Sequence, residues 1–226
     1  MKKIVIFMVL AALVAGGAFA QISLGVGALF DMSFGNGMKL DKYVENANNT
    51  SFGGFVFLDA NYVEVDVSFA YGSLKMSGKK ADGTNMVFTG NEANAGSVLQ
   101  LGFSVLGKYP IHMGSFTVFP LIGASYNMVL SQKDKDGKKV EKFYDLKNLK
   151  ESTALAELSQ FSILGGVGID VPFSGNLFFR AEALFNFRLA SKSMRDVVDI
   201  GKVIDSRVST TMGMGPRIKV GIGFRL

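Results

Sequence analysis

The sequence predicts an all-β fold: a closed, eight-stranded, antiparallel up-and-down transmembrane β-barrel, with short helices possible in the loops of one rim. Three observations support this prediction. Apolar and polar residues alternate in successive segments along most of the chain after residue 20, and such alternation gives a strand one apolar and one polar face. Mean hydropathy is positive, yet no later stretch is apolar and long enough for a spanning helix, as in transmembrane barrels. The connections between segments alternate between long and short.

The first 20 residues are predicted to be a signal peptide. Two lysines precede an apolar run from Ile4 to Val14, which is shorter than the roughly 20 residues of a spanning helix. Ala18 and Ala20 match the A-x-A cleavage signal, so we expect cleavage before Gln21. Residues 21–226 are then predicted to form one barrel domain.

Residues 62–74 show the alternation most clearly. Val63 and Val65 begin an apolar parity that ends at Tyr71, while Glu64 and Asp66 belong to the polar parity. The faces of the second strand remain unassigned, because Phe55 and Phe57 share a parity with Asp59 while Val56 and Leu58 take the other. The predicted strands cover residues 21–31, 51–59, 62–74, 96–108, 116–130, 160–171, 177–189 and 215–226. Pro120 interrupts the fifth strand, and we expect a β-bulge there because proline cannot donate to the ladder.

The connections predict which rim faces outward. Short turns are expected at 59–61, 109–114 and 172–176, and long loops at 32–50, 75–95, 131–159 and 190–209. Barrels of the outer membrane have short periplasmic turns and longer extracellular loops, so both termini are expected in the periplasm. Residues 148–158 could form a short helix. Apolar residues recur at helical spacing between Met194 and Ile204. This segment could either pack within its loop or form a gate over the barrel mouth.

The polar parity carries charges of both signs among Gly and Ser residues. Eight strands leave an interior just wide enough for side chains, and buried charges need partners. We therefore predict a paired network in the lumen, with either a plugged barrel or a narrow, gated pore as its consequence. The small residues of Gly165–Gly168 fit either a bend in the strand or a crowded lumen. The predicted network consists of Glu64, Asp66, Lys108, Asp170, Arg180, Glu182, Arg188, Arg217 and Lys219.

The sequence favours no enzymatic or metal chemistry. Its one histidine, His112, lies in a predicted periplasmic turn without an acidic neighbour, and the chain contains no cysteine. We therefore predict no catalytic, cofactor-binding or metal-binding residues. The formal charge of +5 falls to +3 when Lys2 and Lys3 are removed, which is too small to favour nucleic acid as a partner.

The chain resembles the small eight-stranded outer-membrane barrels, the superfamily of the OmpA transmembrane domain, OmpX and OmpW. The resemblance covers residues 21–226 and includes the final strand, GPRIKVGIGFRL. Val220, Ile222, Phe224 and Leu226 resemble the C-terminal assembly signal of that class, although the aromatic residue stands two positions before the end. Residues 106–126 also resemble a central hairpin of small barrel proteins in spirochaetes.

The resemblance implies a porin-like protein of the cell outer membrane, whose partners include outer-membrane lipid and the barrel-assembly machinery. The superfamily spans anchors, adhesins, channels and lipid-modifying enzymes. We expect a surface protein with an adhesin-like or envelope role, whose four loops bind an unidentified extracellular or envelope ligand. A small gated channel for hydrophobic or small polar solutes is the alternative, and a lipid-modifying enzyme is a distant third.

Overall fold

The computed structural model describes residues 22–40, 43–79, 96–133, 136–139, 143–145, 150–152, 159–189, 208–210 and 212–226. The predicted signal peptide, with Ala18, Ala20 and Gln21, lies outside these residues.

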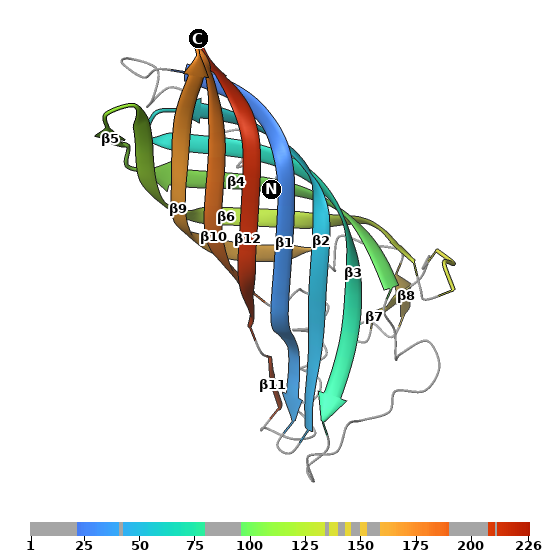
Figure 1. The fold of residues 1–226 in the computed structure, drawn as a ribbon. Helices are drawn as coiled ribbons and strands as arrows, with labels where there is room; N and C mark the ends of the chain where they lie inside the picture. Colours follow the sequence, from blue (N-terminus) through green and yellow to red (C-terminus); the bar gives the residue numbers. More distant parts are fainter. Residues whose placement is uncertain are drawn as a thin grey trace.

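Eight long strands form a closed barrel (Figure 1). Around the ring, each strand pairs antiparallel with the next one along the chain, and the last pairs with the first. The ring therefore has no open edge, and the predicted closed, eight-stranded, up-and-down barrel is confirmed. The strands are β1 (Ile22–Leu40), β2 (Tyr43–Ala60), β3 (Val63–Lys79), β4 (Gly96–Lys108), β6 (Phe116–Lys133), β9 (Gln160–Ser174), β10 (Leu177–Arg188) and β12 (Gly213–Arg225).

Four short strands lie in the described parts of the connections: β5 (Ile111–Met113), β7 (Phe143–Asp145), β8 (Lys150–Ser152) and β11 (Val208–Thr210). β8 pairs with β7, so this part of the helix predicted at residues 148–158 is a strand instead. The possible gate at Met194–Ile204 lies outside the described residues. Within the described ranges, no helix is long and apolar enough to cross a bilayer.

The prediction of a long loop at residues 32–50 is wrong, because most of this segment belongs to the paired strands β1 and β2. β1 and β2 stay paired as far as Leu40 and Tyr43, with a register shift between Ser33 and Asn36. β3 continues beside β2 to Lys79, and β11 pairs with the end of β1. Backbone pairing needs no apolar side chains, so a Gly- and Asn-rich segment can continue a ladder that apolar residues began. These strands run together past the barrel rim at the lower end of Figure 1.

The opposite rim has tight turns. Asn61 joins β2 to β3 with a φ of 61°, in the left-handed region that asparagine tolerates better than most residues. Gly175, with a φ of 52°, joins β9 to β10. Ser23 at the start of β1 pairs with Arg225 at the end of β12, so both terminal strands meet at this rim. Short turns therefore lie at one end of the barrel and the longer connections at the other.

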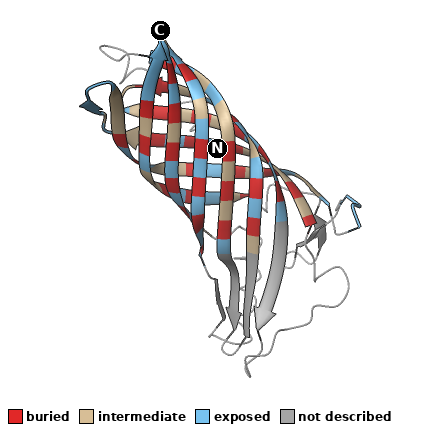
Figure 2. Ribbon diagram, viewed as in Figure 1, coloured by how far each residue is buried: buried red, intermediate tan, exposed pale blue. Residues whose placement is uncertain are grey.

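Buried and exposed residues alternate along every wall strand in Figure 2. The alternation resolves the second strand: Phe55, Phe57 and Asp59 are buried and face the lumen, while Phe52 and Val56 are exposed on the outside. Phe119 and Phe178 are buried as well, so the rings of four phenylalanines lie inside the barrel.

Pro120 causes no bulge, contrary to the prediction. Its pairing with Val167 on β9 is in continuous register. Its carbonyl accepts a hydrogen bond from the amide of Tyr109, and in an antiparallel ladder a residue's nitrogen lies on the same side as its carbonyl. The missing amide therefore points to the interval between β4 and β5, where the ladder is already interrupted. The register shift in the pairing of β4 with β6 lies instead between Leu99 and Gln100.

Candidate functional site

Among the residues that the structure describes, eleven charged side chains form a network in the lumen. All nine predicted members take part in ion pairs with other members, and Asp31 and Asp59 join them. Ten of the eleven residues are at most 6% exposed, and the side chain of the other, Lys108, is 4% exposed. The network forms three groups along the barrel axis.

Arg180 on β10 is the centre of the group nearest the short turns. Its Nε and one terminal nitrogen donate to the two oxygens of Asp170 at 2.7 and 2.6 Å. Its other terminal nitrogen donates to Glu64 Oε2 at 2.6 Å across the lumen. The terminal nitrogen that contacts Asp170 also donates to Asp59 Oδ2 at 2.5 Å. Lys108 also pairs with Asp59. Asp170 is on the neighbouring strand, whereas Asp59 and Glu64 are on strands across the barrel, so one guanidinium connects three walls.

Lys219 on β12 is the centre of the middle group. Its ammonium donates to Glu64 Oε1 at 2.9 Å and to Asp66 Oδ2 at 3.0 Å, both on β3 across the lumen. Glu182 Oε2, opposite Lys219 in the ladder, lies 2.7 Å away as an ion pair outside hydrogen-bond geometry. Glu64 bridges this group to the first, because its two oxygens accept from different cations.

Asp31 on β1 is the centre of the group nearest the long connections. Its Oδ2 accepts from Arg217 Nε at 2.9 Å and from a terminal nitrogen of Arg217 at 2.6 Å. Arg188 donates to the same oxygen at 2.9 Å, and the amide of Asn186 donates to both oxygens at 3.2 and 3.3 Å. Arg217 also donates to Ser125 on β6 at 3.4 Å. This group therefore links the paired first and last strands, β1 and β12, to β6 on the other side of the barrel.

Aromatic rings surround the cations in the part of the lumen nearer the short turns. The Arg180 guanidinium lies 4.5 Å from the Phe57 ring centre and 5.2 Å from those of Phe119 and Phe178. The Lys219 ammonium lies 4.9 Å from the centre of the Phe55 ring. A cation over a ring face is attracted to its quadrupole, more strongly when water is excluded. These rings therefore contribute to the stability of the charges they surround.

Three of the lumen rings fit because a glycine stands beside each of them. A Cβ built on Gly25 would lie 2.3 Å from the Phe57 ring, and one on Gly223 would lie 2.2 Å from the Phe178 ring. Gly168 stands in the same relation to Phe119, at 2.2 Å. The interpretation of Gly165–Gly168 as small residues in a crowded lumen is therefore confirmed at Gly168.

Sequence reasoning missed Asp31, Asp59 and the lumen phenylalanines as parts of this site. Asp31 fell on the polar parity of its strand, which was a usable signal. Asp59 was hidden because Phe55 and Phe57 share its parity. The inward orientation of the phenylalanines can be explained only when the strand register is known, because the register places a glycine next to the ring.

In the part of the chain that the structure describes, the charged side chains of the network are almost completely shielded from solvent. His112 lies exposed in β5, paired with Thr117. Within the described residues, no group of three or more His, Asp or Glu side chains is arranged to hold a metal ion. Val220, Ile222, Phe224 and Leu226 all point outward, with exposed fractions between 40% and 68%.

The chain is similar to several solved structures, three of which follow. They are Neisserial surface protein A (10% identity, 91% of this chain and 97% of that chain covered, TM-score 0.45), a major outer membrane protein from Thermus thermophilus (15%, 91% and 99%, TM-score 0.47), and Ail, the attachment invasion locus protein of Yersinia pestis, in complex with the heparin analogue sucrose octasulfate (15%, 92% and 99%, TM-score 0.36). No protein-family model matches the chain, and no curated protein matches it.

Proposed function

We propose that the chain is an outer-membrane protein whose closed barrel is a membrane anchor with a plugged lumen, and whose function lies in the segments presented beyond its long-connection rim. The observation that carries this proposal is the inverted polarity of the wall. Ile122 is 71% exposed and Phe52 65%, whereas Arg180 is 1% exposed and Glu64 is fully buried. A water-soluble barrel has the opposite distribution, and lipid is the environment in which this one is stable.

The height of the apolar outer band supports the same conclusion. On β3 the outward side chains are apolar or aromatic from Val63 to Tyr71, a span of nine residues. A rise of about 3.3 Å per residue and a tilt of about 40° give a height of about 23 Å, close to the roughly 25 Å band of outer-membrane barrels. Tyr62 and Tyr109, 56% and 65% exposed, lie near the short-turn rim, where aromatic residues favour a membrane interface.

The plugged lumen supports a surface role over a conducting one. Ion pairs cross the interior in two of the three groups, and the members of all three are almost completely shielded from solvent. A pore along the axis would have to break these contacts and leave charges without partners. The long-connection rim, with its paired extension of β1, β2, β3 and β11, is then the part available to an extracellular or envelope ligand. The short turns and both termini are placed in the periplasm in this proposal.

Two measurements test the proposal. Folded protein purified from membranes should migrate differently from boiled protein on a denaturing gel, and it should require detergent to stay in solution. In a planar bilayer it should give no discrete conductance steps, while a known porin in the same bilayer gives them. Solubility without detergent would refute the membrane anchor. Reproducible steps from verified, folded protein would refute the plug and establish a channel.

A further inference from the structure

A continuous row of polar side chains crosses the outer face of four wall strands on the long-connection side of the apolar band. Thr50 on β2 is opposite Ser73 on β3, which is opposite Ser97 on β4. Ser97 is opposite Lys133 on β6, and Lys133 forms an isolated bridge with Lys139. Directly opposed residues of antiparallel strands share a face with Cβ atoms about 5 Å apart. The row therefore presents three hydroxyls followed by two ammonium groups over about 20 Å.

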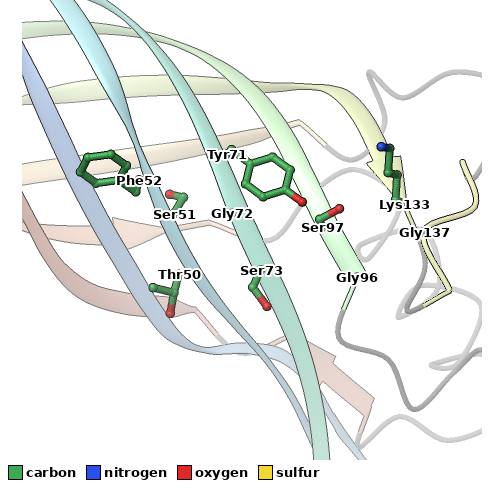
Figure 3. Close-up of a pocket in the computed structure, with 10 residues that line it drawn as sticks. All are labelled: Thr50, Ser51, Phe52, Tyr71, Gly72, Ser73, Gly96, Ser97, Lys133 and Gly137. Atoms are coloured by element: carbon green, nitrogen blue, oxygen red, sulfur yellow. The ribbon is translucent and has the colours of Figure 1, made fainter.

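The row borders directly on aromatic surface. Phe52 is opposite Tyr71, two residues nearer the barrel centre, and these rings are 65% and 59% exposed. A furrow of about 620 Å³ follows this border, lined by Phe52, Tyr71, the hydroxyl residues of the row, Lys133 and Gly137 (Figure 3). One face of the barrel thus places a polar, cationic strip immediately beside an apolar wall.

Lys133 and Lys139 carry like charges and are directly opposed in their bridge. Like charges directly opposed across a ladder are unfavourable, and both side chains are exposed. The described part of the connecting turn contains Lys138 as well as one acid, Asp136. An anion bound between the ammonium groups would offset their repulsion, and the neighbouring hydroxyls can donate hydrogen bonds to its oxygens.

We propose that this row and furrow bind the phosphate-bearing headgroup of an anionic membrane lipid, with the acyl chains lying along the apolar wall below Phe52 and Tyr71. The inference rests on the proposed membrane anchor, because only in a bilayer does this border coincide with the headgroup layer. Lipid is favoured over a soluble polyanion because the same furrow joins cationic and aromatic surface, so it fits an amphiphile.

The test uses protein expressed from the full sequence and purified from membranes in mild detergent. Native mass spectrometry after exposure to equal amounts of dioleoylphosphatidylglycerol and dioleoylphosphatidylcholine reports which lipid is retained. Basic residues near a surface each favour anionic lipid by about fivefold, so a preference of about tenfold or more for phosphatidylglycerol is expected. The double variant Lys133→Gln/Lys139→Gln should lose it. Lys138→Gln removes the same charge from the same turn but not from the row, and should keep it.

Several results would overturn the proposal. They are the absence of a preference in the wild type, an unchanged preference in the double variant, and an equal loss in Lys138→Gln, which would indicate general charge attraction. Displacement of the lipid by inorganic phosphate alone would identify a free-anion site instead. Ser97→Glu, which adds a competing carboxylate to the middle of the row, should also abolish the preference. Failure of the chain to enter detergent or lipid as a folded barrel would instead refute the membrane anchor.

Discussion

The substitution Arg180→Met tests whether the lumen network stabilises the barrel. Methionine keeps an unbranched apolar stem of similar course but removes the guanidinium. Asp170 then loses its two hydrogen bonds, at 2.7 and 2.6 Å. Lys108 still pairs with Asp59, and Lys219 still pairs with Glu64. The main consequence is one buried carboxylate, 6% exposed, without the cation that faced it.

Removing one partner of a buried ion pair costs about 3–5 kcal/mol, because the remaining charge is neither paired nor hydrated. With a urea m-value of about 2 kcal/mol per M, the unfolding midpoint should fall by about 2 M. Adding Asp170→Asn removes the orphaned charge and should recover a large part of the loss. The double-mutant cycle then measures the coupling between the two side chains.

The chain contains no tryptophan, so unfolding is best followed by the fraction of protein with folded mobility on unheated gels across a urea series. Arg225→Gln is the matched control: Arg225 is a half-buried arginine at the rim, with its guanidinium 5.2 Å from the Phe178 ring. Its midpoint should change much less. An Arg180→Met variant that folds with an unchanged midpoint would refute the argument that this guanidinium holds the buried carboxylates.

Three further predictions concern the wall. Gly223→Val should cost about 1–3 kcal/mol by overpacking and be partly rescued by Phe178→Leu, whereas Gly54→Ala, whose nearest contact would be 3.5 Å away, should be close to neutral in the same urea series. Raising NaCl from about 0.05 to about 0.5 M should leave the wild-type midpoint nearly unchanged, because buried pairs are screened little; a large fall would mean that solvent reaches the network. Pro120→Thr should change stability by less than about 0.5 kcal/mol, and a larger loss would contradict the interrupted ladder as the reason proline is tolerated.

The wall could be predicted from sequence because alternation is a local property. The bounds of β4, Gly96–Lys108, are those predicted. The paired extension of β1 and β2 could not be predicted, because Asn- and Gly-rich residues carry turn signals in any context. Whether such a segment loops or pairs depends on the strand beside it.

The candidate site was predictable as a set of charges and not as a set of contacts. Parity placed Arg180 and Glu182 inward, but it could not show that Arg180 pairs with Glu64, a residue 116 positions away. Predicting that phenylalanines lie inside the barrel would have required the strand register as well. Phe57 is stable inside the barrel because Gly25 on the adjacent strand leaves room for its ring, and that relation exists only once the register is fixed.

The network also discriminates between registers that alternation alone would accept. A one-residue slip moves every side chain to the other face and is excluded by the apolar band. A two-residue slip preserves the faces, so other interactions must oppose it. In the observed register of β10 and β12, Glu182 is opposite Lys219. A slip in one direction would place Arg180 opposite Lys219, and a slip in the other would place Glu182 opposite Gly221.

The first alternative sets two cations against each other, and the second leaves Lys219 without its neighbour on β10. Both would occur in an interior where unpaired charges are costly. The ion pairs across the lumen, such as Arg180 with Glu64 and Lys219 with Asp66, can form only when opposite walls meet in the closed barrel. The charges in the lumen therefore help to specify both the register of the last strands and the closure of the ring.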